Sequence, residues 1–321
     1  MPFAFSVNSP TGFLLGFQRR EGLASRQTNG SPESLFRAQG KAFQATDSRS
    51  IAIIVLDTFH VIAYCVDPRN EGREMAMKLE PGCMIENADL SGVDFAEIDL
   101  AGATLTQCVL RDVQLTGTCL QDARLTEVRL IRCRFANVDM RDAIFEGCSF
   151  IDDAGHTGAQ FVFSRLDQTR FRRCDLSFAK IDRSTLFGIE FDACNMRGAE
   201  LHKADFSRAF GRKLVKTAAA FRGCNLEFAD LNGVRMPDCE LSNSNLREAV
   251  LFDSDLEGAD LRGSDLVLAL TAGAKFARAD LRGADVADLN LRELATLDGM
   301  IVSAGQQPHL LAAMGLDVYP D

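Results

Sequence analysis

The chain has 321 residues, 46% of them hydrophobic, and a formal net charge of −10 at pH 7. Its length allows two domains, and its acidity argues against direct binding of nucleic acid and favours a partner with a basic surface. No apolar run reaches the roughly eighteen residues of a membrane span, and no basic segment precedes the short apolar stretch near the N-terminus. We therefore expect neither membrane insertion nor secretion, and a cytoplasmic protein.

Residues 1–80 are expected to form an N-terminal extension. Residues 1–48 are rich in Ser, Gly, Gln and Arg without a sustained period, which indicates loosely ordered chain. Residues 50–66 are apolar and rich in β-branched side chains, which predicts one or two strands. These strands could cap the first coil of the region that follows. Alternatively, translation begins at Met75, Met77 or Met84 and the upstream segment is not part of the working protein.

From about Ile85 onward a large apolar residue recurs at every fifth position, and the residue two before it is small. Ala259 with Leu261 and Ala279 with Leu281 are examples. A period of five fits neither a helix nor a strand and indicates a solenoid. Four five-residue units closing a square coil place residues twenty apart in one inward column. We expect this all-β solenoid to cover residues 81–295.

The residue before each large one is often Asp or Asn, which suits a turn and faces solvent. Residues twenty apart should stack at about 4.8 Å, so two acidic columns are predicted: Glu240, Asp260 and Asp280, and beside it Asp265 and Asp285. The columns could imitate the phosphate row of DNA. They could equally serve only solubility and turn formation, with Arg262 and Arg282 relieving part of the repulsion.

Two segments interrupt the repeat. Residues 151–160 shift its phase by one and must leave the coil as a loop. Residues 207–218 keep the phase but place Gly211 and Lys216 at inward positions, and burying a lysine would cost several kcal/mol, so this segment should leave too. The candidate contact residues are Asp152, Asp153, Gly155 and His156 in the first loop, and Ser207, Arg208, Phe210, Arg212, Lys213 and Lys216 in the second. Either loop is a tolerated surface insertion or a binding element.

The cysteines mostly occupy small inward positions of the repeat, where a thiol acts as a small hydrophobe. They are Cys108, Cys133, Cys148, Cys174, Cys194, Cys224 and Cys239. No C-x-x-C pair exists, so we expect reduced thiols and no metal or cofactor. The four histidines are scattered, and neither a phosphate-binding loop nor a zinc-protease motif occurs. The sequence therefore does not predict an enzyme.

Residues 296–321 are expected to form a C-terminal helix and tail. Pro308 and Gly315 frame a short helix. Its apolar side chains, with one from the tail, are Leu310, Leu311, Met314 and Leu316. Folded against its own coil the helix would be a cap. Packed against a second copy it would form a dimer interface.

Strings such as Ala259-Asp260-Leu261-Arg262-Gly263 resemble the pentapeptide-repeat family, and the resemblance implies a right-handed quadrilateral β-helix. Within that family the chain resembles the Qnr quinolone-resistance group and its MfpA-like relatives over roughly residues 107–321. The matching stretches are Cys148-Ser149-Phe150-Ile151, Phe187-Gly188-Ile189-Glu190-Phe191, Gly223-Cys224-Asn225-Leu226 and the tail from Gln306 to Asp321.

This resemblance implies a homodimer joined at its C-terminal ends, with both loops contacting DNA gyrase or topoisomerase IV and protecting it from quinolones. Two alternatives remain: a gyrase inhibitor without protective activity, and a structural scaffold with an unrelated partner. The first eighty residues and the extra repeats between Ile85 and Leu105 have no counterpart in the resemblance, and the second loop is more basic than it implies.

Overall fold

The structure, a computed structural model, describes residues 5–7, 15–17, 50–55, 61–66, 79–152, 154–211 and 214–317. It divides into two units, Met1–Lys78 and Leu79–Asp321. In the first unit β1 (Phe5–Val7) pairs antiparallel with β2 (Leu15–Phe17), and β3 (Ser50–Val55) with β4 (Val61–Val66). The strands β3 and β4 lie within the stretch where the sequence predicts them. Most of the segment expected to be loosely ordered lies outside the described residues.

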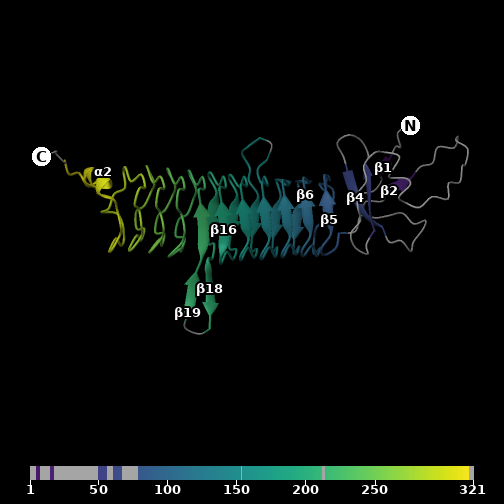
Figure 1. The fold of residues 1–321 in the computed structure, drawn as a ribbon, viewed down its shortest axis with the longest axis horizontal. Coiled ribbons are helices and arrows are strands. Elements are labelled where there is room, and N and C mark those ends of the chain that lie inside the picture. The colour runs from purple at the N-terminus through teal and green to yellow at the C-terminus, as the bar shows by residue number, and fades with distance from the viewer. Residues whose placement is uncertain are drawn as a thin grey trace, which may run out of the picture. The chain divides into compact units, whose positions relative to one another are not determined.

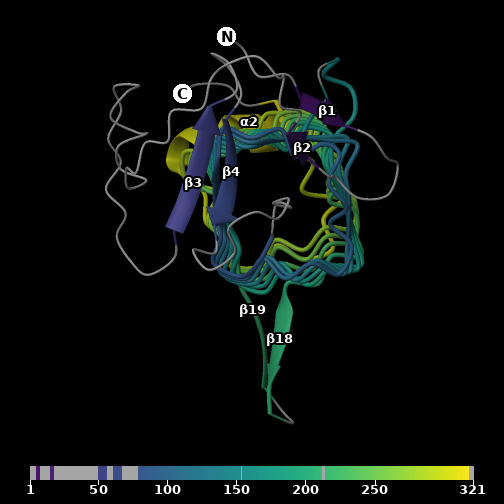
Figure 2. The same ribbon diagram turned by 90° about the vertical axis from the view of Figure 1, so that its right-hand side faces the viewer.

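The second unit is a square β-helix (Figures 1 and 2). Its strands are short and parallel and form three ladders. The longest contains β5 (Met84–Glu86), β6 (Thr104–Thr106), β9 (Arg124–Thr126), β12 (Ile144–Glu146), β14 (Arg170–Arg172), β16 (Ile189–Asp192) and β20 (Ala219–Arg222). The next contains β8 (Gln114–Thr116), β11 (Arg134–Ala136), β13 (Gln160–Val162), β15 (Lys180–Asp182) and β17 (Glu200–His202), and the shortest β7 (Val109–Arg111) and β10 (Arg129–Ile131).

The square coil has four faces, three with a strand ladder and one with single bridges only. They are named A to D in the order in which the chain meets them. Face A carries the ladder that begins with β5, face B the pair β7 and β10, and face C the ladder that begins with β8. Face D is joined by single bridges such as Thr185 with Asp205. Beyond β20 all faces continue as such bridges, for example from Glu240 to Asp260.

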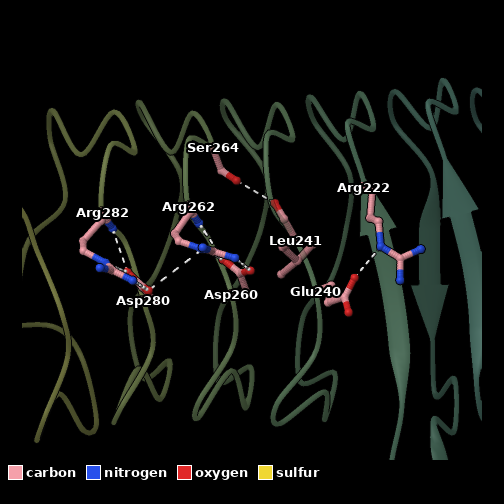
Figure 3. A network of polar contacts seen from close by, with 8 residues as sticks. All are labelled: Arg222, Glu240, Leu241, Asp260, Arg262, Ser264, Asp280 and Arg282. Carbon is pink, nitrogen blue, oxygen red and sulfur yellow. Dashed lines mark hydrogen bonds and ion pairs between the residues drawn. The ribbon is translucent and has the colours of Figure 1, made fainter.

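The core is the inside of the coil, filled as the period of five predicts. The large residue of each repeat and the small residue two before it are buried, for example Leu261 and Ala259, both at 0% exposure. Small polar residues in the inner columns donate to the carbonyl of a neighbouring coil, as Ser264 Oγ does to Leu241 at 2.6 Å (Figure 3). The predicted inward stacking is therefore confirmed.

The corners differ in detail from the expectation. The Asp or Asn before each large residue lies on a face. Its side-chain oxygen often accepts a hydrogen bond from the backbone N–H two residues later, as Asp265 Oδ1 does from Val267 at 2.9 Å. The residue two after the large one turns the chain in the left-handed region, for example Asn243 at φ 56° and Gly263 at φ 70°. Gly, Asn and Asp adopt this region most readily and recur at this position, but the coil also holds larger residues there, such as Phe228 and Leu268, both at φ 59°.

Phenylalanines stack along face A past both interruptions. The ring centroids of Phe145 and Phe171 lie 4.8 Å apart, those of Phe171 and Phe191 5.1 Å, and those of Phe191 and Phe221 4.9 Å, with interplanar angles between 10° and 21°. The first of these steps crosses the first interruption in the sequence, and the last crosses the second. The stack therefore keeps consecutive coils in register where the chain leaves the helix and returns.

The solenoid ends in the short helix η1 (Ala304–Gln306) and the helix α2 (Gln307–Ala313). Gln306 Nε2 donates to the carbonyls of Leu281 at 2.7 Å and Ala284 at 2.8 Å, so its side-chain amide ties the helix to the last coils. Leu310 is buried at 6% exposure. The predicted C-terminal helix is confirmed. In the described part of the chain, no helix has the length and apolar character of a membrane span.

Candidate interaction surfaces

The first interruption is a compact loop, residues 152–157, called loop A. Neighbouring coils are normally 20 residues apart, but Asp139 pairs with Arg165, 26 residues on. The coil therefore holds six extra residues, which an antiparallel bridge between Ile151 and Gly158 closes off. Loop A projects from the coil as the sequence predicted (Figure 1). Asp153 lies outside the described residues.

The carboxylate of Asp152 is used inside loop A. Its Oδ1 accepts the backbone N–H of His156 at 2.8 Å and of Thr157 at 3.0 Å, and these hydrogen bonds lower the pKa of Asp152. Gly155 takes a left-handed conformation at φ 72°. Asp152 therefore folds the loop, and the exposed tip of the loop is residues 154–157.

Gly158, which the sequence interpretation did not single out, directly follows loop A and packs closely against the next coil. A Cβ here would lie 2.4 Å from the carbonyl oxygen of Ser177, the carbonyl carbon of Phe178 and the nitrogen of Ala179. These are backbone atoms of the next coil and cannot rotate away. Only glycine lets the chain re-enter the helix at this position.

The second interruption is a β-hairpin, formed by β18 (Ser207–Phe210) and β19 (Leu214–Thr217) and called the hairpin below. Asn195 pairs with Asn225, 30 residues on, so the coil holds ten extra residues. The hairpin stands out from the solenoid (Figures 1 and 2), which confirms that this segment leaves the coil.

The hairpin combines basic and exposed apolar side chains. Arg208 is opposite Lys216, and Phe210 is opposite Leu214. Phe210, Leu214 and Val215 are 47%, 49% and 63% exposed. Ser207 donates both its N–H and its hydroxyl to Asp205, so it braces the base of the hairpin. Arg212 and Lys213 lie outside the described residues.

The hairpin packs against Phe187 on face D. The guanidinium of Arg208 lies 5.1 Å from the centre of its ring, and the ring of Phe210 meets it edge-on at 5.7 Å. Phe187 is only 9% exposed although its position in the repeat faces outward. On the other strand Thr217 Oγ1 donates to the carbonyl of Pro237 at 3.0 Å. Contacts on both sides therefore fix the direction of the hairpin.

Loop A and the hairpin leave opposite corners of the square. Loop A follows face B and precedes face C, whereas the hairpin follows face D and precedes face A. Two and a half coils separate them along the axis, about 12 Å at the usual strand spacing. One flat surface cannot contact both protrusions. A partner that engages both must surround part of the coil.

The acidic column Glu240, Asp260 and Asp280 lies in register on face A (Figure 3). Arg262 Nη2 is 2.6 Å from Asp260 Oδ2, Arg282 Nη2 is 2.6 Å from Asp280 Oδ2, and Arg222 pairs with Glu240. Arg262 also reaches Asp280 at 4.0 Å. Hydrogen bonds from the arginines lower the pKa of Asp260 and Asp280, so both stay ionised. The column is an ion-pair ladder, not a row of unpaired negative charge.

The second acidic column lies on face B and is less neutralised. Asp265 bridges to Asp285 in the next coil. Arg247 Nη1 lies 3.2 Å from Asp265 Oδ2. Asp285 is exposed and forms no ion pair with any of the described residues. Of the two predicted acidic columns, the one on face B is therefore the one that keeps unpaired negative charge.

The C-terminal end buries part of its predicted apolar stripe and exposes the rest. Leu310 packs into the chain's own coil, which supports the capping interpretation for this residue. Leu311 and Met314 are partly exposed, and Leu316 is 47% exposed. Leu297 and Ile301 of the last coil are 40% and 44% exposed. An apolar patch therefore remains at this end of the solenoid.

The cysteines of the inner columns are buried, and burial raises the pKa of Cys133 to about 12. Among the residues that the structure describes, no group of three or more His, Cys, Asp or Glu side chains could hold a metal ion.

Known proteins share both the repeat and the fold. The model of the pentapeptide repeats family matches in 8 copies within residues 88–126, 118–152 and 238–266. The pentapeptide repeat protein QnrB4 of Escherichia coli is 26% identical over 102 residues, which cover 32% of this chain and 47% of that protein. The chain thus matches about half the length of this curated relative.

Solved structures of QnrB1, a plasmid-mediated fluoroquinolone resistance protein, match the solenoid. The full-length structure has 26% identity and a TM-score of 0.56, covering 60% of this chain and 91% of QnrB1. A trypsin-treated variant has 25% identity and a TM-score of 0.58, covering 68% of this chain and 99% of that one. This chain is therefore similar to the Qnr pentapeptide-repeat proteins in its repeat and in its fold.

Proposed function

We propose that this protein binds a type II topoisomerase, DNA gyrase or topoisomerase IV, and protects it from quinolone-type poisons. The observation that carries the proposal is the pair of rigidly held protrusions, loop A and the hairpin, on a β-helix similar to QnrB1. The role is one of binding and requires no chemistry or cofactor. The expected location is the cytoplasm, where such a partner works.

The hairpin supplies the stronger of the two contacts. Its exposed Phe210, Leu214 and Val215 offer apolar area next to Arg208 and Lys216. Such a mixture of aromatic, aliphatic and arginine side chains is typical of the energetic centre of an interface. Loop A adds a smaller contact through its tip. Because the protrusions leave opposite corners, we place the coil between two walls of the enzyme, as in a channel that holds duplex DNA.

The charge of the solenoid supports docking without defining it. On face A the acidic column is paired with arginines, so DNA mimicry there is weaker than the sequence indicates. Asp285 and its neighbours on face B keep a negative field for a basic wall. Long-range attraction then steers association, and the protrusions choose the partner.

The dimer in this proposal forms through the C-terminal ends. Leu297, Ile301 and Leu316 remain exposed there, and two copies would bury them by two-fold symmetry. Ile301→Arg with Leu316→Arg should then give monomers by light scattering. Leu310 is unsuitable for this test because it packs inside its own chain.

The deciding experiment is a supercoiling assay with gyrase, DNA and ciprofloxacin. We compare the full chain with a variant lacking residues 208–217, because removing these ten residues restores the regular spacing of the coils. Rescue by the full chain and loss of rescue in the variant support the proposal. Inhibition of gyrase without rescue indicates an inhibitor instead, and no effect on gyrase or topoisomerase IV indicates a scaffold for another partner.

A further inference from the structure

A strip of apolar side chains on the C-terminal half of the solenoid belongs neither to the protrusions nor to the C-terminal end. It consists of Phe228, Val250, Leu268 and Leu270 and is called the corner strip. Phe228, Leu268 and Leu270 are 39%, 50% and 47% exposed. Single exposed apolar residues are common on protein surfaces, but several that gather within three coils at one corner, beside charged side chains, are a candidate interaction site.

The repeat brings these residues together at the corner between faces B and C. Val250 bridges to Leu270 in the next coil of face C. Leu268 is the left-handed corner residue of its coil, at φ 59°, and Phe228 holds the same corner two coils earlier, at φ 59°. At about 4.8 Å per coil the strip is roughly 10 Å long.

Acidic side chains surround the corner strip. Glu248 and Asp288 occupy the corner positions directly before and after Leu268, and Asp285 lies beside them on face B. All three are exposed, and none forms an ion pair with the described residues. Two basic side chains close by are already engaged, Arg197 with Glu227 at 3.1 Å and Arg247 with Asp265 at 3.2 Å, whereas Arg292, four residues after Asp288, is exposed.

One internal contact shows the chemistry that the strip accepts. The guanidinium of Arg197 lies 4.8 Å from the centre of the Phe228 ring, which still leaves the ring 39% exposed. A cation over an aromatic face gains about 0.5–1 kcal/mol at an exposed site. The free part of the ring and the nearby carboxylates offer the same environment to a second cation.

We propose that the corner strip binds a cationic amphipathic segment of a partner protein, with apolar side chains on the leucines and lysine or arginine against Glu248, Asp285 and Asp288. A second copy of this chain fits less well, because a two-fold contact would place these carboxylates opposite their own copies. Nucleic acid and anionic membranes are repelled by the same charges.

The test uses the full chain and a fluorescein-labelled amphipathic peptide of leucine and lysine, with fluorescence anisotropy as the readout. The control peptide carries glutamate in place of lysine. Leu268→Gln with Leu270→Gln should weaken binding of the lysine peptide about tenfold or more, because two apolar contacts are lost. Glu248→Gln with Asp288→Asn should weaken it and flatten its dependence on salt.

Met84→Gln is the matched control variant, since Met84 is 54% exposed on the first coil, far from the corner strip. It should bind the lysine peptide like the unmodified chain. Equal binding of both peptides, no saturable binding, or unchanged binding by the double leucine variant would overturn the proposal. So would a drop in mass by light scattering in the leucine variant without peptide binding, because the occupant would then be a second copy.

Discussion

Phe187→Ala should loosen the hairpin while leaving the solenoid intact. Phe187 lies at an outward position of the repeat, and Arg208 and Phe210 of the hairpin pack against its ring. The substitution removes the cation contact with Arg208, worth about 0.5–1 kcal/mol, and the edge-on contact with Phe210, worth about 0.5–1.5 kcal/mol. A two-stranded hairpin is marginal by itself, so this seat supplies much of its local stability.

Losing about 1–2.5 kcal/mol should raise the population of the open hairpin roughly 5- to 70-fold. The measurement is hydrogen exchange of the β18 and β19 amides, with the amides of β16 as an internal reference. Phe163→Ala is the matched control, because Arg183 lies 5.3 Å from the centre of that ring, which is 51% exposed and has no hairpin over it. Unchanged amide exchange of β18 and β19 in the Phe187 variant would refute the idea that packing on Phe187 stabilises the hairpin.

Two further predictions concern loop A. Gly158→Ala forces a Cβ to 2.4 Å from backbone atoms of the next coil and should cost about 1–3 kcal/mol. Its melting temperature should be lower than that of Gly305→Ala, where no atom lies within 4 Å and the backbone is not left-handed; equal melting of the two variants would contradict this. The pKa of Asp152 is lowered from its usual 3.8 by the amides of His156 and Thr157, so its carboxylate should order loop A above about pH 4 and lose this effect as pH falls through the lowered value. Asp152→Asn keeps a side-chain acceptor that does not titrate, so hydrogen exchange should show both amides protected down to low pH. Protection that changes neither with pH in the unmodified chain nor with the substitution would contradict this role of Asp152.

The period of five was enough to predict the solenoid and both protrusions. An inward column requires a large residue at a fixed spacing, so a segment that shifts the phase or offers Lys216 to the core must leave the coil. The same logic gives the register of Glu240, Asp260 and Asp280, which the structure shows in the bridges of face A. Spacing fixes backbone positions in a repeat because each coil templates the next.

The side-chain partners could not be derived from that spacing alone. Glu240 pairs with Arg222, 18 residues before it, and Asp260 with Arg262, two residues after it. Long arginine side chains reach several neighbours on the coil surface, and a repeat pattern does not choose among them. Gly158 and Phe187 were missed for a different reason: their roles come from segments that break the period. A large aromatic residue at an outward position beside an interruption was the available signal for Phe187.

The phenylalanine stack explains how so regular a solenoid tolerates two insertions. The strand pairs of face A continue past both insertions, but each insertion lengthens the chain between two consecutive coils, and strands whose register is weakly specified can slip. Phe145, Phe171, Phe191 and Phe221 stack across both gaps, and shifting one ring would break packing on both of its sides. The rings therefore help to hold the coils in register on both sides of loop A and the hairpin. Binding residues are often carried by loops that a rigid scaffold positions, so recognition is expected to depend on the hairpin more than on the repeat.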